Sequence, residues 1–261
     1  MTLPTSPSRR ARFLSRVEEL GAASDRVWLV GLCTGLAFTL IAAYRFPYPA
    51  SVSGKWWAYA GLALRASLYL WSREALRGRG GETLARLFAL GLVAGTFELL
   101  VDWWLIHGVS SGRLVYLTGN DVVLLGSPIW MPLAWACIIV ELGYLAVRLF
   151  GVLRRRGVRG AAVLASLLCA VSAGLTVGCY EYLAYRAGWW KYEPARAMLG
   201  ATCAVYIPFG EFLMFLPILP IAAHALAEDR RPVAAAIESG ACFAGAIAAG
   251  YALAYWVCER G

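Results

Sequence analysis

Residues 84–107 read LARLFALGLVAGTFELLVDWWLIH, and this stretch decides the fold. It is long and apolar enough to cross a bilayer, which takes about 20 mostly apolar residues in a helix. Six further runs share this character, at 27–44, 56–72, 127–149, 161–186, 201–227 and 232–257. The sequence therefore predicts an all-α, polytopic transmembrane bundle of about seven helices.

The composition excludes an ordinary soluble domain. Of the 261 residues, 60% are hydrophobic and only 15% are charged, whereas soluble domains carry about 25% charged residues. The mean hydropathy is +0.62. We expect a basic cytoplasmic N-terminal segment at 1–26 and a single seven-helix transmembrane domain at 27–258.

The net charge is +8, and the basic residues are concentrated in alternate loops. Basic clusters precede the first run and follow the second, fourth and sixth, so every second loop is basic, as the positive-inside rule requires. This pattern predicts an integral membrane protein, in a bacterial inner membrane, with a cytoplasmic N-terminus and an outside C-terminus. It argues against nucleic-acid binding. The clustered residues are Arg9, Arg10, Arg12, Arg16, Arg26, Arg73, Arg77, Arg79, Arg154, Arg155, Arg156, Arg159, Arg230 and Arg231.

Cysteine and histidine give no sign of a metal centre. The seven cysteines fall mostly in predicted spans at no metal-ligand spacing, and there are only two histidines. We expect neither a metal nor a redox cofactor, although an all-carboxylate magnesium site stays open because carboxylate oxygens suit hard cations.

Glutamate occurs twice in similar apolar surroundings, GTFELL at 95–100 and GCYEYL at 178–183. An ionised side chain inside a span costs about 2.5–3.5 kcal/mol or more, so such residues usually mark a functional site. Each glutamate is followed by a polar outside loop and then by a run with proline in its outer part. The third and fourth spans therefore resemble the fifth and sixth, which predicts a parallel repeat with a site between the halves.

Four acids are the candidate catalytic residues: Glu98, Asp102, Glu181 and Glu211. Glu98 and Asp102 are four residues apart and share one helix face. Two carboxyl groups that close in a low dielectric do not both ionise, so one keeps a proton that it can donate. The candidate substrate-binding residues are mostly aromatic: Arg65, Trp103, Trp130, Trp135, Tyr182, Tyr185, Trp189, Tyr192 and Tyr206.

The structural alternative is that these acids form ion pairs. Arg65 lies in the second span and is a candidate partner of Glu98 or Asp102. Near the outer surface, Arg113 and Arg186 are candidates to reach an acid.

Two segments carry a resemblance to known enzymes. The first is GWWKYEP at 188–194, followed by Gly200 and IPFGEFLMF at 207–215; the second is LLGSP at 124–128 through Trp135. The first resembles the lycopene cyclase domain of small membrane carotenoid cyclases, whose paired glutamates correspond to Gly210 and Glu211. The second is similar to carotenoid hydratase-type membrane proteins. The small size and intramembrane acids also resemble membrane-bound terpene cyclases.

The resemblance implies an isomerase or lyase that cyclises or hydrates a terpenoid or carotenoid drawn from the membrane lipid. Carboxylic acids would protonate the substrate without a cofactor. Two alternatives stay open, a small proton-coupled transporter and a non-catalytic pigment-binding or lipid-binding membrane protein. The sequence leaves the oligomeric state undetermined.

Overall fold

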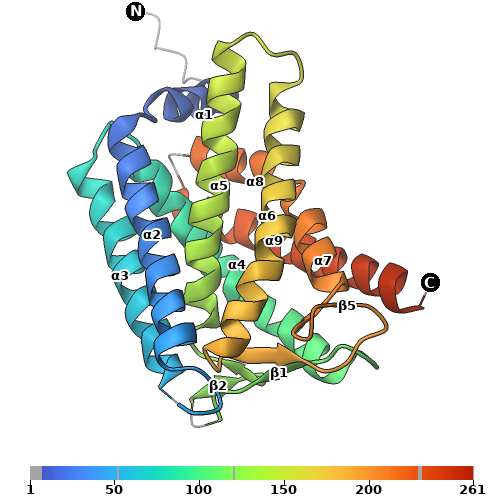
Figure 1. Ribbon diagram of the computed structural model, residues 1–261. Coiled ribbons are helices and arrows are strands. Elements are labelled where there is room, and N and C mark those ends of the chain that lie inside the picture. Colours follow the sequence, from blue (N-terminus) through green and yellow to red (C-terminus); the bar gives the residue numbers. More distant parts are fainter. Residues whose placement is uncertain (1–7, 52, 120, 229–230, 261) are drawn as a thin grey trace, which may run out of the picture.

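The computed structural model describes residues 8–51, 53–119, 121–228 and 231–260 (Figure 1). The helices in this part are α1 Arg9–Glu18, α2 Ala22–Arg45, α3 Gly54–Ala75, α4 Gly81–His107, α5 Met131–Arg155, α6 Ala161–Arg186, α7 Tyr206–Phe215, α8 Ile218–Ala227, α9 Pro232–Tyr255 and the π-helix η1 Trp256–Arg260. The short strands are β1 Leu114–Tyr116, β2 Val123–Leu124, β3 Ser127–Pro128, β4 Trp190–Tyr192, β5 Met198–Leu199 and β6 Cys203–Ala204.

The helices confirm an all-α membrane protein. Five helices are long and apolar enough to span a bilayer, namely α2, α4, α5, α6 and α9 with η1. The pair α7 and α8 counts as a sixth span if its 42° bend is one broken passage. Each of the seven predicted runs thus corresponds to a helix or a bent pair, but α3 is less apolar because it carries Lys55, Arg65 and Arg73.

Several predicted boundaries differ from the structure, and the first run, expected from 27, already begins at Ala22. The fourth run was expected from 127, yet Ser127 and Pro128 form β3 and α5 begins at Met131. The sixth run, expected over 201–227, begins as α7 at Tyr206 and breaks before Pro217. Proline has no backbone N–H and clashes with the preceding turn, which explains this break.

Helix α1 and the short strands β1 and β2 lie at opposite ends of the bundle (Figure 1). Helix α4 packs against α5 and α9, and α7 packs between α6 and α9, while α2, α3 and α5 run side by side in Figure 1. Arg12 of α1 donates from Nε to the carbonyl of Ala227 at 2.5 Å, at what we call the α1 end. Tyr255 accepts from the backbone N–H of Ser110 at 2.9 Å at the other end. The latter we call the strand end, comprising 108–119, 121–130 and 187–205.

The order of elements repeats along the chain. Helix α4, strand β1, the hairpin β2–β3 and helix α5 are followed by α6, β4, the hairpin β5–β6 and α7. Strands β1 and β4 pair antiparallel, with Val115 opposite Lys191. The two units are therefore joined to each other at the strand end, directly beyond the helices that carry Glu98 and Glu181.

Candidate functional site

Four buried carboxyl groups converge below the paired strands. Glu98 and Asp102 come from α4, Glu181 from α6 and Glu211 from α7, and their exposed fractions are 1%, 3%, 6% and 6%. Glu98 lies within electrostatic range of Asp102 and Glu211, and Glu181 within range of Glu211 and Asp102. The structure thus brings the four predicted catalytic residues together, and we call them the acid cluster.

The partners of the acid cluster are neutral donors. None of the ion pairs between described residues includes one of these four acids, so none of the four has an arginine or lysine partner there. A buried charge without a counter-ion is expensive. The cluster therefore depends on hydrogen bonds and shared protons.

Asp102 is held by two hydroxyl groups from the strand end. Tyr116 of β1 donates to its Oδ2 atom, and Ser127 of β3 donates to the same atom at 2.8 Å. Burial, followed by the negative charge of Asp102, raises the pKa of Tyr116 well above its ordinary value. Tyr116 therefore stays a proton donor over the physiological range, and donors of this kind favour the ionised form of their acceptor.

Glu181 and Glu211 each accept from one aromatic residue. The indole N–H of Trp190 donates to Glu181, and the hydroxyl of Tyr251 donates to Glu211 at 2.8 Å. Tyr192 of β4 also interacts with Glu181. Burial, followed by the negative charge of Glu181, raises the pKa of Tyr192 well above its ordinary value, so Tyr192 too stays protonated.

Glu98 differs from the other three acids. Its side chain interacts with Asp102 and with Trp135 of α5, but its Oε2 atom is buried with no hydrogen-bond partner in the described part of the chain. Buried polar atoms are almost always satisfied, so an exception needs an explanation. A substrate or water at this oxygen would supply one.

Some predicted aromatic residues lie beside the cluster. Trp135 and Tyr192 contact its acids, as described above. Trp130 and Trp189 pack with Trp190 at centroid distances of 6.2 and 6.1 Å, and Tyr206 donates to the carbonyl of Gly112 at 2.8 Å. Trp130 and Trp189 are thus joined to the cluster through Trp190, which donates to Glu181.

Other predicted binding residues lie away from the cluster. Trp103 and Tyr182 have exposed fractions of 48% and 44% and face outward from the bundle. Tyr185 packs against Tyr48 rather than toward Glu181. A helix turns by about 100° per residue, so Trp103 and Tyr182, each next to an acid, point away from it.

Arg65 does not join the acid cluster. Its Nη1 atom lies 2.7 Å from Oε1 of Glu141, a mid-span residue of α5. The predicted pairing with Glu98 or Asp102 is therefore wrong, because α3 brings Arg65 against α5 at that depth. At the outer surface, Arg113 does reach an acid, Glu193, at 2.8 Å.

The residues that hold the acids in place were missed in the sequence prediction. Tyr116, Ser127 and Trp190 lie at the strand end, and only their nearness to the repeat loops could have indicated them. Tyr251 is 40 residues from Glu211, and no local pattern marks it. Its position follows from the packing of α7 against α9.

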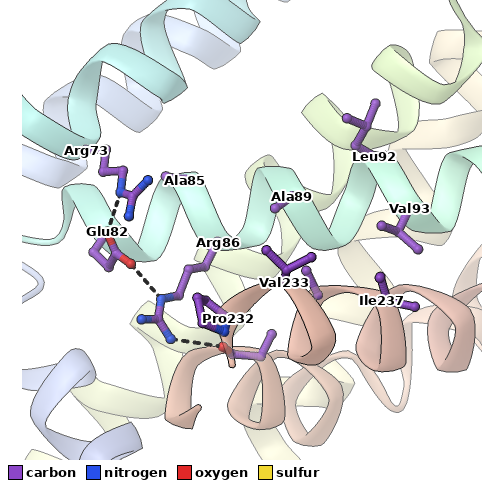
Figure 2. Close-up of a pocket in the computed structure, with 12 residues that line it drawn as sticks. Arg73, Glu82, Ala85, Arg86, Ala89, Leu92, Val93, Pro232, Val233 and Ile237 are labelled. Carbon is purple, nitrogen blue, oxygen red and sulfur yellow. Dashed lines mark hydrogen bonds and ion pairs between the residues drawn. The ribbon is translucent and has the colours of Figure 1, made fainter. Parts of the chain in front are cut away.

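A groove between α4 and α9 lies apart from the acid cluster. Figure 2 shows Arg73 and Arg86 on either side of Glu82, with apolar residues such as Leu92 and Ile237 along the groove. Arg86 also donates to the carbonyl of Glu228 at 2.6 Å, beyond the end of α8. Its guanidinium thus ties α4 to this turn, and none of the predicted site residues lines the groove.

Comparisons with known proteins identify a family without assigning an activity. No curated protein and no solved structure matches the chain. Within the described residues, no group of three or more His, Cys, Asp or Glu side chains is placed to hold a metal ion. Residues 99–258, more than half of the chain, match the family described as "Domain of unknown function (DUF6989)". This match includes Asp102, Glu181 and Glu211, and the chain belongs to that family.

Proposed function

We propose that this protein is a membrane-embedded enzyme that protonates a polyisoprenoid, a terpenoid or carotenoid, and directs the resulting carbocation to a cyclised or hydrated product. The observation that carries this proposal is the convergence of four buried carboxyl groups from α4, α6 and α7, none of which has a basic partner in the described part of the chain. Apolar surroundings and a neighbouring carboxylate favour a carboxylic acid that keeps its proton, as general acid catalysis requires.

The hydrogen bonds suggest a role for each acid. Asp102 accepts from two hydroxyl groups and suits the ionised state, whereas Glu98 has an oxygen without a partner and suits the proton donor. The proton of Glu98 adds to one carbon of an alkene, and the other carbon becomes cationic. In a cyclisation, a second double bond attacks the cation to form a carbon–carbon bond. Loss of a proton to Asp102 or Glu181 then restores an alkene, so protons balance.

Aromatic rings beside the acids suit a cationic intermediate. Trp135, Trp190 and Tyr192 all contact acids of the cluster. The face of such a ring stabilises a desolvated cation by about 2 kcal/mol. These rings would therefore lower the free energy of the proposed intermediate.

The positive-inside pattern supports an orientation with the α1 end in the cytoplasm and the strand end outside, in a bacterial inner membrane. The basic loops at 76–80 and 156–160 precede α4 and α6. Both helices then run toward the strand end, where the acid cluster lies. A polyisoprenoid dissolved in the bilayer would reach the cluster laterally, and the proposed chemistry uses no cofactor.

The test is replacement of Glu98, Glu181 and Glu211 singly by glutamine in a lycopene-producing host, with extraction and mass spectrometry of the isoprenoids. Glu193→Gln is the matched control, because Glu193 is an acid of the strand end that pairs with Arg113 outside the cluster. We expect the control to keep product formation and at least one cluster variant to lose it. An isomer of unchanged mass indicates cyclisation, and the gain of one water indicates hydration.

Undiminished product from all three glutamine variants would contradict the mechanism. Proton-dependent uptake by vesicles without a change in isoprenoid composition would replace the enzyme with a small proton-coupled transporter. Co-purified pigment that is bound but unaltered would indicate a pigment-binding protein instead.

A further inference from the structure

The hairpin β2–β3 exposes an apolar surface at the strand end. We call residues 122–129, which read VVLLGSPI, the apolar hairpin; they carry no charge. The exposed fractions of Val122, Val123, Leu124, Leu125 and Ile129 run from 42% to 67%. Contiguous exposed apolar residues of this kind mark a contact with a protein or a membrane.

The turn of the apolar hairpin keeps a leucine where the backbone disfavours one. Leu125 and Gly126 connect the strands with φ values of 55° and 89°. Such two-residue turns prefer asparagine or aspartate followed by glycine. A left-handed conformation costs an ordinary L-residue about 1–2 kcal/mol. An apolar side chain at the tip therefore has a cost that its surroundings must offset.

The apolar hairpin continues a lipid-facing surface of α4. Gly126 lies against Ile106, so closely that a Cβ atom there would be 3.0 Å from its Cδ1 atom. The outward side of α4 below this contact carries Phe97, Leu100 and Trp103, with exposed fractions of 45%, 57% and 48%. Because α4 is long and apolar enough to span a bilayer, lipid covers this side.

The root of the apolar hairpin is fixed to the bundle. Asp121 accepts from the hydroxyl of Tyr59 at 2.8 Å and from the indole N–H of Trp130 at 3.0 Å. Ser127 is buried and donates to Asp102 of the acid cluster at 2.8 Å. The exposed tip is therefore held in one direction beside α4 and is not a loose loop.

We propose that the apolar hairpin is inserted into the lipid interface at the strand end, where the side chains of Val122 to Leu125 contact lipid. The occupant of this surface is lipid because the hairpin packs on Ile106 at the end of the lipid-covered side of α4. The polar residue at this junction is His107, whose ring packs on that of Trp103 with the centroids 5.6 Å apart. Trp103 lies at this level, as tryptophan does at membrane interfaces. The proposal does not depend on the enzymatic activity, because it concerns only how the strand end meets the bilayer.

The test places a fluorophore at the tip. Leu124→Cys is labelled with the environment-sensitive dye NBD and reconstituted in phosphatidylcholine vesicles. Lys191→Cys is the matched control, since Lys191 is an exposed residue of β4 at the same end of the bundle. Both variants are made in a background where the native cysteines that are not buried are replaced by alanine, namely Cys33, Cys179, Cys242 and Cys258.

We expect the label at position 124 to emit at shorter wavelength than the label at 191. Nitroxide-bearing phosphatidylcholine should quench it, and aqueous iodide should lose most of its quenching effect there. Equal iodide quenching at the two positions would overturn the proposal. So would shielding of position 124 from both quenchers, because a protein partner would then cover the hairpin. Val123→Cys, 56% exposed in the wild type, serves as a second variant if Leu124→Cys does not fold.

Discussion

Removing Arg65 tests whether the buried ion pair between α3 and α5 holds these helices together. Arg65 and Glu141 are in contact at 2.7 Å, with side chains only 12% and 13% exposed. The other donor to the Glu141 carboxyl is Tyr69, at 3.3 Å. Arg65→Met therefore leaves a buried carboxyl group with one long hydrogen bond.

The expected cost follows from this loss of partner. Breaking a buried ion pair from one side costs about 3–5 kcal/mol, whereas replacing both partners by apolar residues is often neutral or stabilising. In Arg65→Met/Glu141→Leu, the hydroxyl of Tyr69 loses its acceptor, which costs about 1–3 kcal/mol. The double variant is therefore expected to be more stable than Arg65→Met, with a favourable coupling of about 2 kcal/mol or more.

The assay is thermal unfolding of the purified protein in detergent, followed by intrinsic tryptophan fluorescence at a fixed scan rate. For a chain of this size, 1 kcal/mol corresponds to about 2–4 °C in the midpoint. We expect Arg65→Met to lower the midpoint by roughly 10 °C and the double variant to recover much of that loss. Glu141→Leu alone completes the cycle. If the double variant loses the sum of the losses measured for Arg65→Met and Glu141→Leu, the side chains do not stabilise each other and the reasoning is wrong.

Three further changes test other contacts. Tyr251→Phe removes the hydroxyl that donates to Glu211. Because the acceptor is buried, we expect the free energy of unfolding to fall by about 1.5–3 kcal/mol, measured by thermal unfolding. We also expect loss of the proposed product, measured by mass spectrometry. Gly54→Ala would bring its Cβ onto a carbonyl oxygen after α6, whereas Gly245→Ala meets nothing within 4 Å; only the former should lower the unfolding midpoint. Leu125→Asn suits the left-handed turn and should raise the free energy of unfolding in detergent by about 1 kcal/mol. The unfolding midpoint should therefore rise, and a lower midpoint would contradict this.

The membrane class and the helix order could be predicted because both depend on local composition. Glu98 and Asp102 could be placed on one face for the same reason, since a four-residue spacing fixes their relation in any helix. The break before Pro217 was harder to predict, because proline inside a membrane helix is often tolerated. Local pattern therefore predicted the spans better than their interruptions.

Side-chain partners could not be predicted, because they depend on which helices meet. Arg65 had several acids as possible partners, and only the packing of α3 against α5 selects Glu141. Trp190, the first residue of β4, donates to Glu181, whereas Trp189, just before the strand, donates to the carbonyl of Gly54 at 2.8 Å. The sequence shows two adjacent tryptophans and does not show which one faces the acids.

Gly210 of α7 leaves room for the phenol that binds Glu211. A Cβ atom at this position would collide with the ring of Tyr251, whose hydroxyl binds Glu211. Gly210→Glu would therefore displace Tyr251 and remove the donor to Glu211. A second carboxyl group at position 210 and the present position of Tyr251 exclude each other.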